Sequence, residues 1–169
     1  MLTAICRDVC SEDLARCELT CIDRAPIDAA RFIRQHDAYV EALSSTPGVR
    51  VLQLPCLLGH PDAHFVEDAA IVLDEVAICT RPGALSRRDE VDSIALLLST
   101  LLPNVERIVE PGTLDGGDVL VMCERRVIFV GQSTRTNRCA FDQLQSITAR
   151  FGYKCIVCPV QHCLHLKLR

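Results

Sequence analysis

Apolar residues recur at helical spacing in three segments of the chain, at 27–44, 88–101 and 138–151. The apolar stripe of the first segment consists of Phe32, Tyr39, Val40 and Leu43. Asp28 suits the first turn of that helix, and Ser86 is a candidate cap for the second. The pattern therefore predicts three amphipathic helices.

Short apolar runs with strand-like composition surround these helices. One run follows each helix, at 49–54, 105–109 and 153–158. A pair of runs precedes each of the last two helices, and tight polar turns join the pairs, which lie at 70–73 with 76–80 and at 119–123 with 126–130. The order hairpin, helix, strand occurs twice at an offset of about 49 residues (119 − 70). Such a period predicts a repeat architecture within an α/β fold, although an ordinary α/β domain could give the same spacing by coincidence.

Composition places this pattern in a globular protein. The 169 residues are 49% apolar and 24% charged, with a net charge of −4 and no basic block. Nucleic acid and membrane are therefore not expected partners, and a cytoplasmic location is the default prediction. The eleven cysteines are too few for a disulfide scaffold of this length, so most are predicted to be reduced.

Ionisable residues gather in three short runs next to predicted strands. Asp62, Glu67 and Asp68 precede the strand that begins near residue 70, where paired carboxylates can hold a planar guanidinium. Asp115 precedes a Gly-Gly pair and can orient a histidine or bind a cation. His165, in the run CLHLK, suits proton transfer near neutral pH. We expect this last run to be extended, with Cys163, His165 and Lys167 on one face.

These runs can also be read as ordinary structure. The acidic run taken alone is more often a solvated turn, and a histidine between leucines is more often a core residue. Two arginines follow the strand pairs, Arg87 in TRPGALSRR and Arg135 in STRTN. Either can hold a substrate carboxylate with two hydrogen bonds, or can serve as a surface ion-pair partner.

Read together and in order, five motifs resemble the dimethylarginine dimethylaminohydrolase (dimethylargininase) family of the pentein, or guanidino-group-modifying, superfamily. They are PDxxFVED, TRPGAxSRR, EPGTLDGGD, SxRTN and LHLK, and they span nearly the whole chain. The resemblance implies a pentein-type α/β propeller of five ββαβ units, of which this chain would hold about three. On that basis 1–169 is expected to be a single, incomplete α/β-propeller domain that lacks the C-terminal units. Open strand edges would then favour a homo-oligomer.

The resemblance also implies a chemistry, namely hydrolysis of Nω-methylated arginine to citrulline and methylamine or dimethylamine. A cysteine attacks the guanidinium carbon, a thiouronium intermediate forms, and no metal or organic cofactor takes part. Carried over by position, His165 is the general acid and base, and Asp115 replaces the acid, often Glu, that supports it. The resemblance assigns substrate binding to Leu19, Asp62, Glu67, Asp68, Arg87 and Arg135.

The chain departs from the family pattern at two places. The family's nucleophile lies beyond LHLK, and none of the eleven cysteines occupies its position. We therefore expect this chain by itself not to turn over dimethylarginine. His64 stands where the family more often has Val, and could narrow the pocket.

Four other interpretations remain open from the sequence. An arginine deiminase-type enzyme or a non-catalytic arginine-binding pentein would share most of the motifs. A zinc-binding module could use Cys155, Cys158, His162 and His165, although the two ligand pairs are unusually close. A disulfide-stapled binding module could use the helical spacing of Cys6 with Cys10 and of Cys17 with Cys21.

Overall fold

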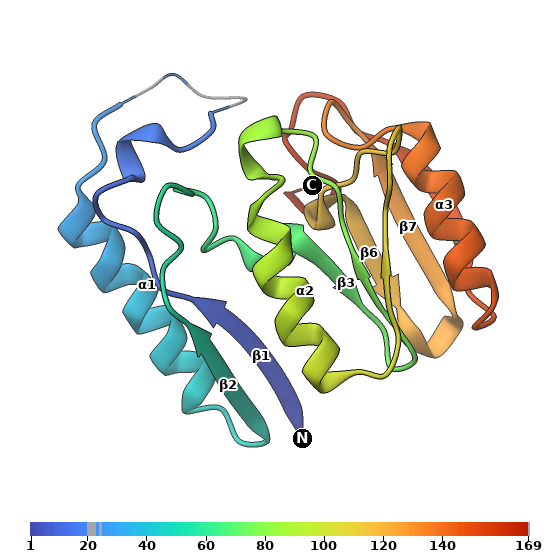
Figure 1. The fold of residues 1–169 in the computed structure, drawn as a ribbon, viewed down its shortest axis with the longest axis horizontal. Helices are drawn as coiled ribbons and strands as arrows, with labels where there is room; N and C mark the ends of the chain where they lie inside the picture. The colour runs from blue at the N-terminus through green and yellow to red at the C-terminus, as the bar shows by residue number, and fades with distance from the viewer. Residues whose placement is uncertain (20–22, 24, 169) are drawn as a thin grey trace. The chain divides into compact units, whose positions relative to one another are not determined.

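The computed structural model describes residues 1–19, 23 and 25–168, which divide into two compact units at residues 66 and 67. In the first unit, strands β1 (Leu2–Arg7) and β2 (Val49–Leu54) pair in parallel, and helix α1 (Ala29–Ser44) connects them and packs on β2 (Figure 1). The Asp28 side chain caps α1 by accepting a hydrogen bond from the Arg31 amide. This βαβ arrangement gives the unit its parallel pair of strands.

The second unit contains two three-stranded sheets of the same topology. In the first sheet β3 (Ala70–Val72) pairs antiparallel with β4 (Ala77–Cys79), and β5 (Val105–Arg107) pairs parallel with β4 after helix α2 (Glu90–Leu101). Helix α2 packs against all three strands. The hairpin, helix and strand therefore form one ββαβ unit.

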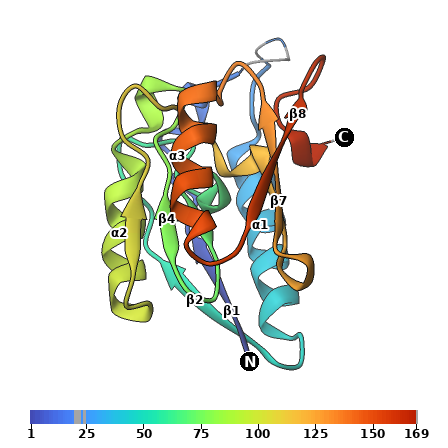
Figure 2. The same cartoon turned by 90° about the vertical axis from the view of Figure 1, so that its right-hand side faces the viewer.

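The second sheet repeats this plan. Strand β6 (Val119–Met122) pairs antiparallel with β7 (Val127–Gln132), and β8 (Lys154–Pro159) pairs parallel with β7 after helix α3 (Arg138–Ala149). Figure 2 shows α3 beside β7 and β8. The predicted duplication of hairpin, helix and strand is thus confirmed, with strand ends shifted by one or two residues.

One apolar core serves both sheets of the second unit. Leu114, Ile128 and Leu144 are fully buried in it, and Ile78 and Val119 join from the two hairpins. Burying large aliphatic side chains of this kind contributes roughly 1.5–3 kcal/mol each. The core therefore holds the ends of β3 and β6 at fixed positions, and the polar turns that precede these strands carry the candidate site.

Four details of the fold differ from the sequence prediction. Strand β1 was not predicted, although its LTAIC run is apolar. Tyr39 is 58% exposed and does not belong to the buried stripe of α1. Ser86 lies inside a short 3-10 turn at Leu85–Arg87, and Asp89 is the N-cap of α2. The segment around His165 is not extended, because Leu166–Leu168 forms a 3-10 turn.

Three separate sheets are present in the described residues, and none of them closes on itself. The α/β class is confirmed, while the propeller of five units, the count of three, and the single domain over 1–169 stay predictions. Among the described residues, no helix combines the length and apolarity needed to cross a bilayer.

Candidate active site

Three short 3-10 turns carry the candidate site. They are Val66–Ala69 before β3, Gly116–Asp118 before β6, and Leu166–Leu168 near the end of the described chain. The last two turns contact each other. Polar side chains at the starts of two strands are thereby brought next to His165.

Close packing explains the two glycines between Asp115 and Asp118. A Cβ on Gly116 would lie 2.0 Å from the Glu67 carbonyl oxygen, and one on Gly117 would lie 2.8 Å from the His165 ring. Only glycine lets the backbone approach both groups so closely. Gly117 therefore makes room for the imidazole, and Gly116 makes room for the Glu67 backbone.

His165 is 8% exposed and has carboxylates near both ring nitrogens. Nε2 lies 3.8 Å from Asp68 Oδ1 and 4.0 Å from Asp115 Oδ2, and Nδ1 lies 3.7 Å from Asp118 Oδ2. Burial lowers the pKa of His165, but Asp118, Asp68 and Asp115 raise it by more, so that its pKa is raised overall. The imidazolium form is favoured, as a proton donor requires.

Asp68 is held by two donors. Its Oδ2 accepts from Arg87 Nη1 at 2.7 Å and its Oδ1 accepts from the Gly117 amide at 2.9 Å. Arg87 in turn donates from Nε and Nη2 to Glu90 Oε2, at 3.1 and 3.0 Å. The buried Arg87 guanidinium thus lies between two carboxylates, which fixes the Asp68 carboxylate in front of His165.

Asp115 is 1% exposed, and only one of its two carboxylate oxygens accepts a hydrogen bond within the described residues. Its Oδ1 accepts from the Gly83 amide at 2.9 Å, while Oδ2 accepts no hydrogen bond within the part of the chain that the structure describes. Arg135 Nη1 is 3.9 Å from that oxygen. Burial raises the pKa of Asp115, and the charge of Asp68 adds to this rise. An unpartnered buried carboxylate oxygen beside His165 is suited to receive a donor from a ligand.

The predicted site residues thus fall into three groups. His165, Asp68, Asp115, Arg87 and Arg135 are brought together in the second unit. Glu67 is exposed next to them and forms an ion pair with Lys167, whose Nζ lies 2.8 Å from Glu67 Oε1.

Leu19 and Asp62 belong to the first unit, where Leu19 is half-buried. Asp62 is buried there and accepts from the Glu18 amide at 2.9 Å. The substrate-binding roles that the resemblance assigned to all these residues stay predictions.

Sequence reasoning missed two acids of the site. Asp118 ends the GGD run and Glu90 lies in the predicted second helix, but neither received a role in the site. The available signal for Asp118 was its place directly before an apolar strand. The partner of Glu90, by contrast, depends on the bend that turns Arg87 inward, which the sequence pattern does not reveal.

The zinc-binding and disulfide-stapled interpretations receive no support from the geometry of the described residues. Cys155 packs against Thr148 Oγ1 at 3.6 Å, while His165 lies among carboxylates, and no group of three potential metal ligands converges in the described residues. The described cysteines, Cys6, Cys10 and Cys17 among them, are free thiols, and Cys21 lies outside the described residues.

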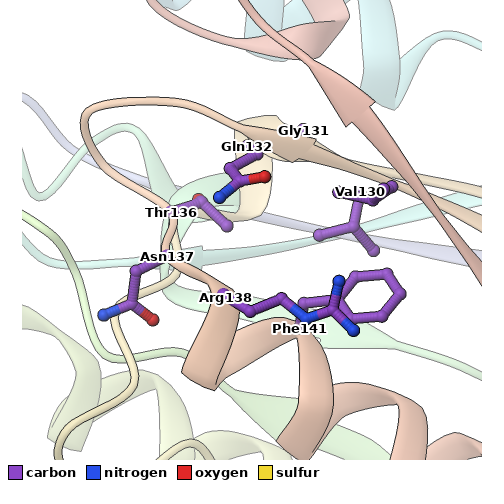
Figure 3. Close-up of a pocket in the computed structure, with 8 residues that line it drawn as sticks. Val130, Gly131, Gln132, Thr136, Asn137, Arg138 and Phe141 are labelled. Atoms are coloured by element: carbon purple, nitrogen blue, oxygen red, sulfur yellow. The ribbon is translucent and has the colours of Figure 1, made fainter.

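A small hollow of the second unit lies outside the set of predicted site residues. Figure 3 shows it between β7 and the start of α3, lined by Val130, Gly131, Thr136 and Phe141 among others. The Arg138 guanidinium lies 4.8 Å from the centre of the Phe141 ring there and donates to Asp142. None of the predicted site residues lines this hollow.

Comparison with known proteins places this geometry in a family. The chain is 40% identical over 157 residues to the N(G),N(G)-dimethylarginine dimethylaminohydrolase of Streptomyces coelicolor, covering 93% of this chain and 60% of that protein. It is 38% identical over 141 residues to the enzyme of the same name from Pseudomonas aeruginosa, covering 83% of this chain and 54% of that one. No family model matches the chain.

Solved structures show the same similarity. The Pseudomonas aeruginosa enzyme, as a mutant in complex with citrulline, superposes with a TM-score of 0.90 at 34% identity over 98% of this chain and 63% of that one. A cyanobacterial arginine dihydrolase domain shares the fold at a TM-score of 0.67 and 18% identity, over 79% of this chain and 48% of that one.

Fold and site together define an α/β protein of the pentein superfamily. Within it, the chain is similar over most of its own length to dimethylarginine dimethylaminohydrolases. It spans 54% to 60% of the length of these two curated relatives.

Proposed function

We propose that this protein acts on Nω-methylated arginine, releasing methylamine or dimethylamine and leaving citrulline. The observation that carries the proposal is the buried His165 with Asp68 and Asp115 on one side of its ring and Asp118 on the other. Anionic oxygens of this kind attract a planar guanidinium, and the raised pKa of the histidine keeps a proton ready for an amine leaving group.

The proposed reaction has two steps. A cysteine thiolate attacks the guanidinium carbon, a C–S bond forms, and the C–N bond to the methylated nitrogen breaks as that nitrogen takes a proton from His165 Nε2. Water then attacks the thiouronium carbon and gives one proton to His165, and the C–S bond breaks to release the thiolate while the second proton of the water is lost to solvent, which leaves citrulline. Asp68 and Asp115 stabilise the positive charge of the guanidinium throughout.

We propose that the nucleophile is not Cys163, the cysteine nearest to His165 in sequence. Its Sγ is engaged with the carbonyl oxygen of His165 at 3.5 Å, and it does not share a face of an extended strand with the imidazole. On this proposal the chain binds methylated arginine, and the thiol comes from a family position that none of its own cysteines occupies.

Equilibrium binding tests the proposal. Isothermal titration of N(G),N(G)-dimethylarginine into the purified chain should show binding that Asp68→Asn weakens about tenfold or more, the effect of losing a charge-assisted contact. Citrulline, which lacks the guanidinium charge, should bind more weakly. The matched control is Asp92→Asn, which removes an exposed carboxylate paired with Arg107 and should leave binding unchanged.

Two results would refute parts of this account. Equal affinity for citrulline and dimethylarginine would show that the carboxylates do not recognise the guanidinium charge. Formation of citrulline by the chain, abolished by Cys163→Ala, would make Cys163 the nucleophile after all.

A further inference from the structure

In the first unit, the chain segments that continue from β1 and β2 stay next to each other beyond the ends of the strands. The parallel register places Arg7 opposite Leu54 at those ends. The Asp8 amide then donates to the Leu54 carbonyl at 2.9 Å, and Arg7 Nη1 donates to the Pro55 carbonyl at 3.0 Å. The two segments therefore leave the sheet together.

Each of these segments forms a turn at a cysteine. In the first segment the Asp13 amide donates to the Cys10 carbonyl at 3.2 Å. In the second segment the His60 amide donates to the Leu57 carbonyl at 3.1 Å, and Cys56 directly precedes that turn. The two cysteines therefore lie at similar places in two neighbouring turns.

Side chains connect the two turns to each other. Asp13 Oδ2 accepts from the Gly59 amide at 2.7 Å. The thiols of Cys10 and Cys56 are joined by a side-chain hydrogen bond. Burial raises the pKa of the Cys10 thiol to about 12, and the contact with Cys56 and the charge of Asp13 add to this rise. A disulfide requires two cysteines whose side chains meet, and this pair satisfies that condition.

Other buried thiols of the described chain have oxygen partners instead. Cys17 Sγ donates to the Pro61 carbonyl at 3.7 Å, and Cys155 Sγ lies 3.6 Å from Thr148 Oγ1. A direct contact between two thiols therefore distinguishes the pair at 10 and 56 from these cysteines.

We propose that Cys10 and Cys56 form a reversible disulfide when the protein is exposed to hydrogen peroxide. Cys56 is partly exposed whereas Cys10 is buried, so the Cys56 sulfur reacts first. It attacks one peroxide oxygen, the O–O bond breaks, and Cys56 becomes a sulfenic acid while one molecule of water is released. The Cys10 sulfur then attacks the Cys56 sulfur, the S–O bond breaks, and the S–S bond forms with release of a second water. The thiol pair is oxidised by two electrons, which reduce the peroxide.

The disulfide restrains the segments that lead to Leu19 and Asp62. The Glu18 amide donates to Asp62 Oδ2 at 2.9 Å, as the Gly59 amide does to Asp13. A covalent bond between the two segments limits how far they separate, and hydrogen exchange requires such a separation. Exchange of the Glu18 and Gly59 amides should therefore slow in the oxidised chain.

Peptide mapping by mass spectrometry tests the proposal on the wild-type chain. Trypsin cuts after Arg7 and Arg16, so Cys10 is isolated in a peptide that contains no other cysteine. The chain is treated with hydrogen peroxide, and the remaining thiols are then alkylated with iodoacetamide under denaturing conditions. The alkylated form of the Cys10 peptide should be lost and recovered as a cross-linked peptide, with fragmentation locating the bond at Cys56. Dithiothreitol should restore the alkylated form when it is added before the iodoacetamide.

Two variants sharpen the test. Cys56→Ser should leave Cys10 open to alkylation after the same treatment. Cys139→Ser is the matched control, because it removes an exposed thiol of α3 and should leave the cross-link unchanged.

Three results would overturn the proposal. They are full alkylation of Cys10 in the oxidised wild type, a bond from Cys10 to a cysteine other than Cys56, and an unchanged exchange rate of the Gly59 amide after oxidation. The mapping uses the wild-type chain, so the test stands even where Cys56→Ser does not fold. Neither readout depends on the binding of methylated arginine.

Discussion

At the residue scale, the acids of the site differ in how many hydrogen bonds their carboxylates accept from the protein. Asp118 accepts hydrogen bonds from the protein on both oxygens, Asp68 is fixed by Arg87 and Gly117, and Asp115 keeps one buried oxygen that accepts no hydrogen bond within the described residues. The last of these is the least favourable for folding, since burial and a neighbouring carboxylate both oppose its charge. Such unsatisfied groups concentrate where a ligand is to be bound.

Asp115→Asn should therefore stabilise the chain near neutral pH. The pKa of Asp115 is raised from its ordinary value of 3.8 in the folded state, so the ionised carboxylate costs stability once the pH exceeds that raised value. The variant keeps an oxygen for the Gly83 amide. We expect a gain of about 1 kcal/mol at pH 8, or roughly 2–4 °C in Tm.

The same comparison at low pH supplies the check. Below pH 3.8 the carboxyl is protonated in both the folded and the unfolded chain, so the advantage of the variant should shrink toward zero as the pH falls. Thermal unfolding followed by circular dichroism measures both. A variant that is less stable than the wild type at pH 8 would contradict the raised pKa.

At the scale of elements, the start of α3 anchors the loop that leads to Asp115. Asn137 Oδ1 accepts from the Ala140 amide at 2.9 Å, as a helix cap does, and from the Thr113 amide at 3.1 Å. Its Nδ2 donates to the Pro111 carbonyl at 2.9 Å. One side chain thus joins the second ββαβ unit to the loop that precedes the GGD turn.

Asn137→Ala should cost about 2–3 kcal/mol of unfolding free energy, roughly 1 for the cap and about 1 for each further hydrogen bond. Asp89→Ala is the matched control, because Asp89 is the N-cap of α2 but makes no side-chain capping bond. Its cost should be about 0.5 kcal/mol or less. Urea unfolding of both variants measures the difference, and equal costs would show that the extra bonds of Asn137 contribute nothing.

The elements were predictable from the sequence to the extent that their signals are local. Alternating apolar runs and polar turns located both hairpins, and helical periodicity located α1, α2 and α3 within two residues at their starts and ends. The short turns of the site were less predictable. Leu166–Leu168 is bent because the Leu166 amide bonds to Asp118, 48 residues earlier, and no local pattern encodes that contact.

At the scale of the whole molecule, the ordered motifs predicted a resemblance to dimethylarginine dimethylaminohydrolases, and the similarity to curated relatives and solved structures confirms it. The motifs also selected His165, Asp68 and Asp115, which the second unit brings together. The motifs assigned roles to the acids by position alone and gave none to Asp118, whose Oδ2 comes to 3.7 Å from His165 Nδ1 only in the folded chain. Only the folded arrangement shows which carboxylate lies on which side of the imidazole.

The most direct measurement of the central claim is the pKa of His165 with and without saturating N(G),N(G)-dimethylarginine. If the guanidinium lies among Asp68, Asp115 and the Nε2 edge of the ring, its positive charge should lower the pKa of His165. Binding that leaves the titration of His165 unchanged would place the ligand elsewhere on the protein and contradict the account.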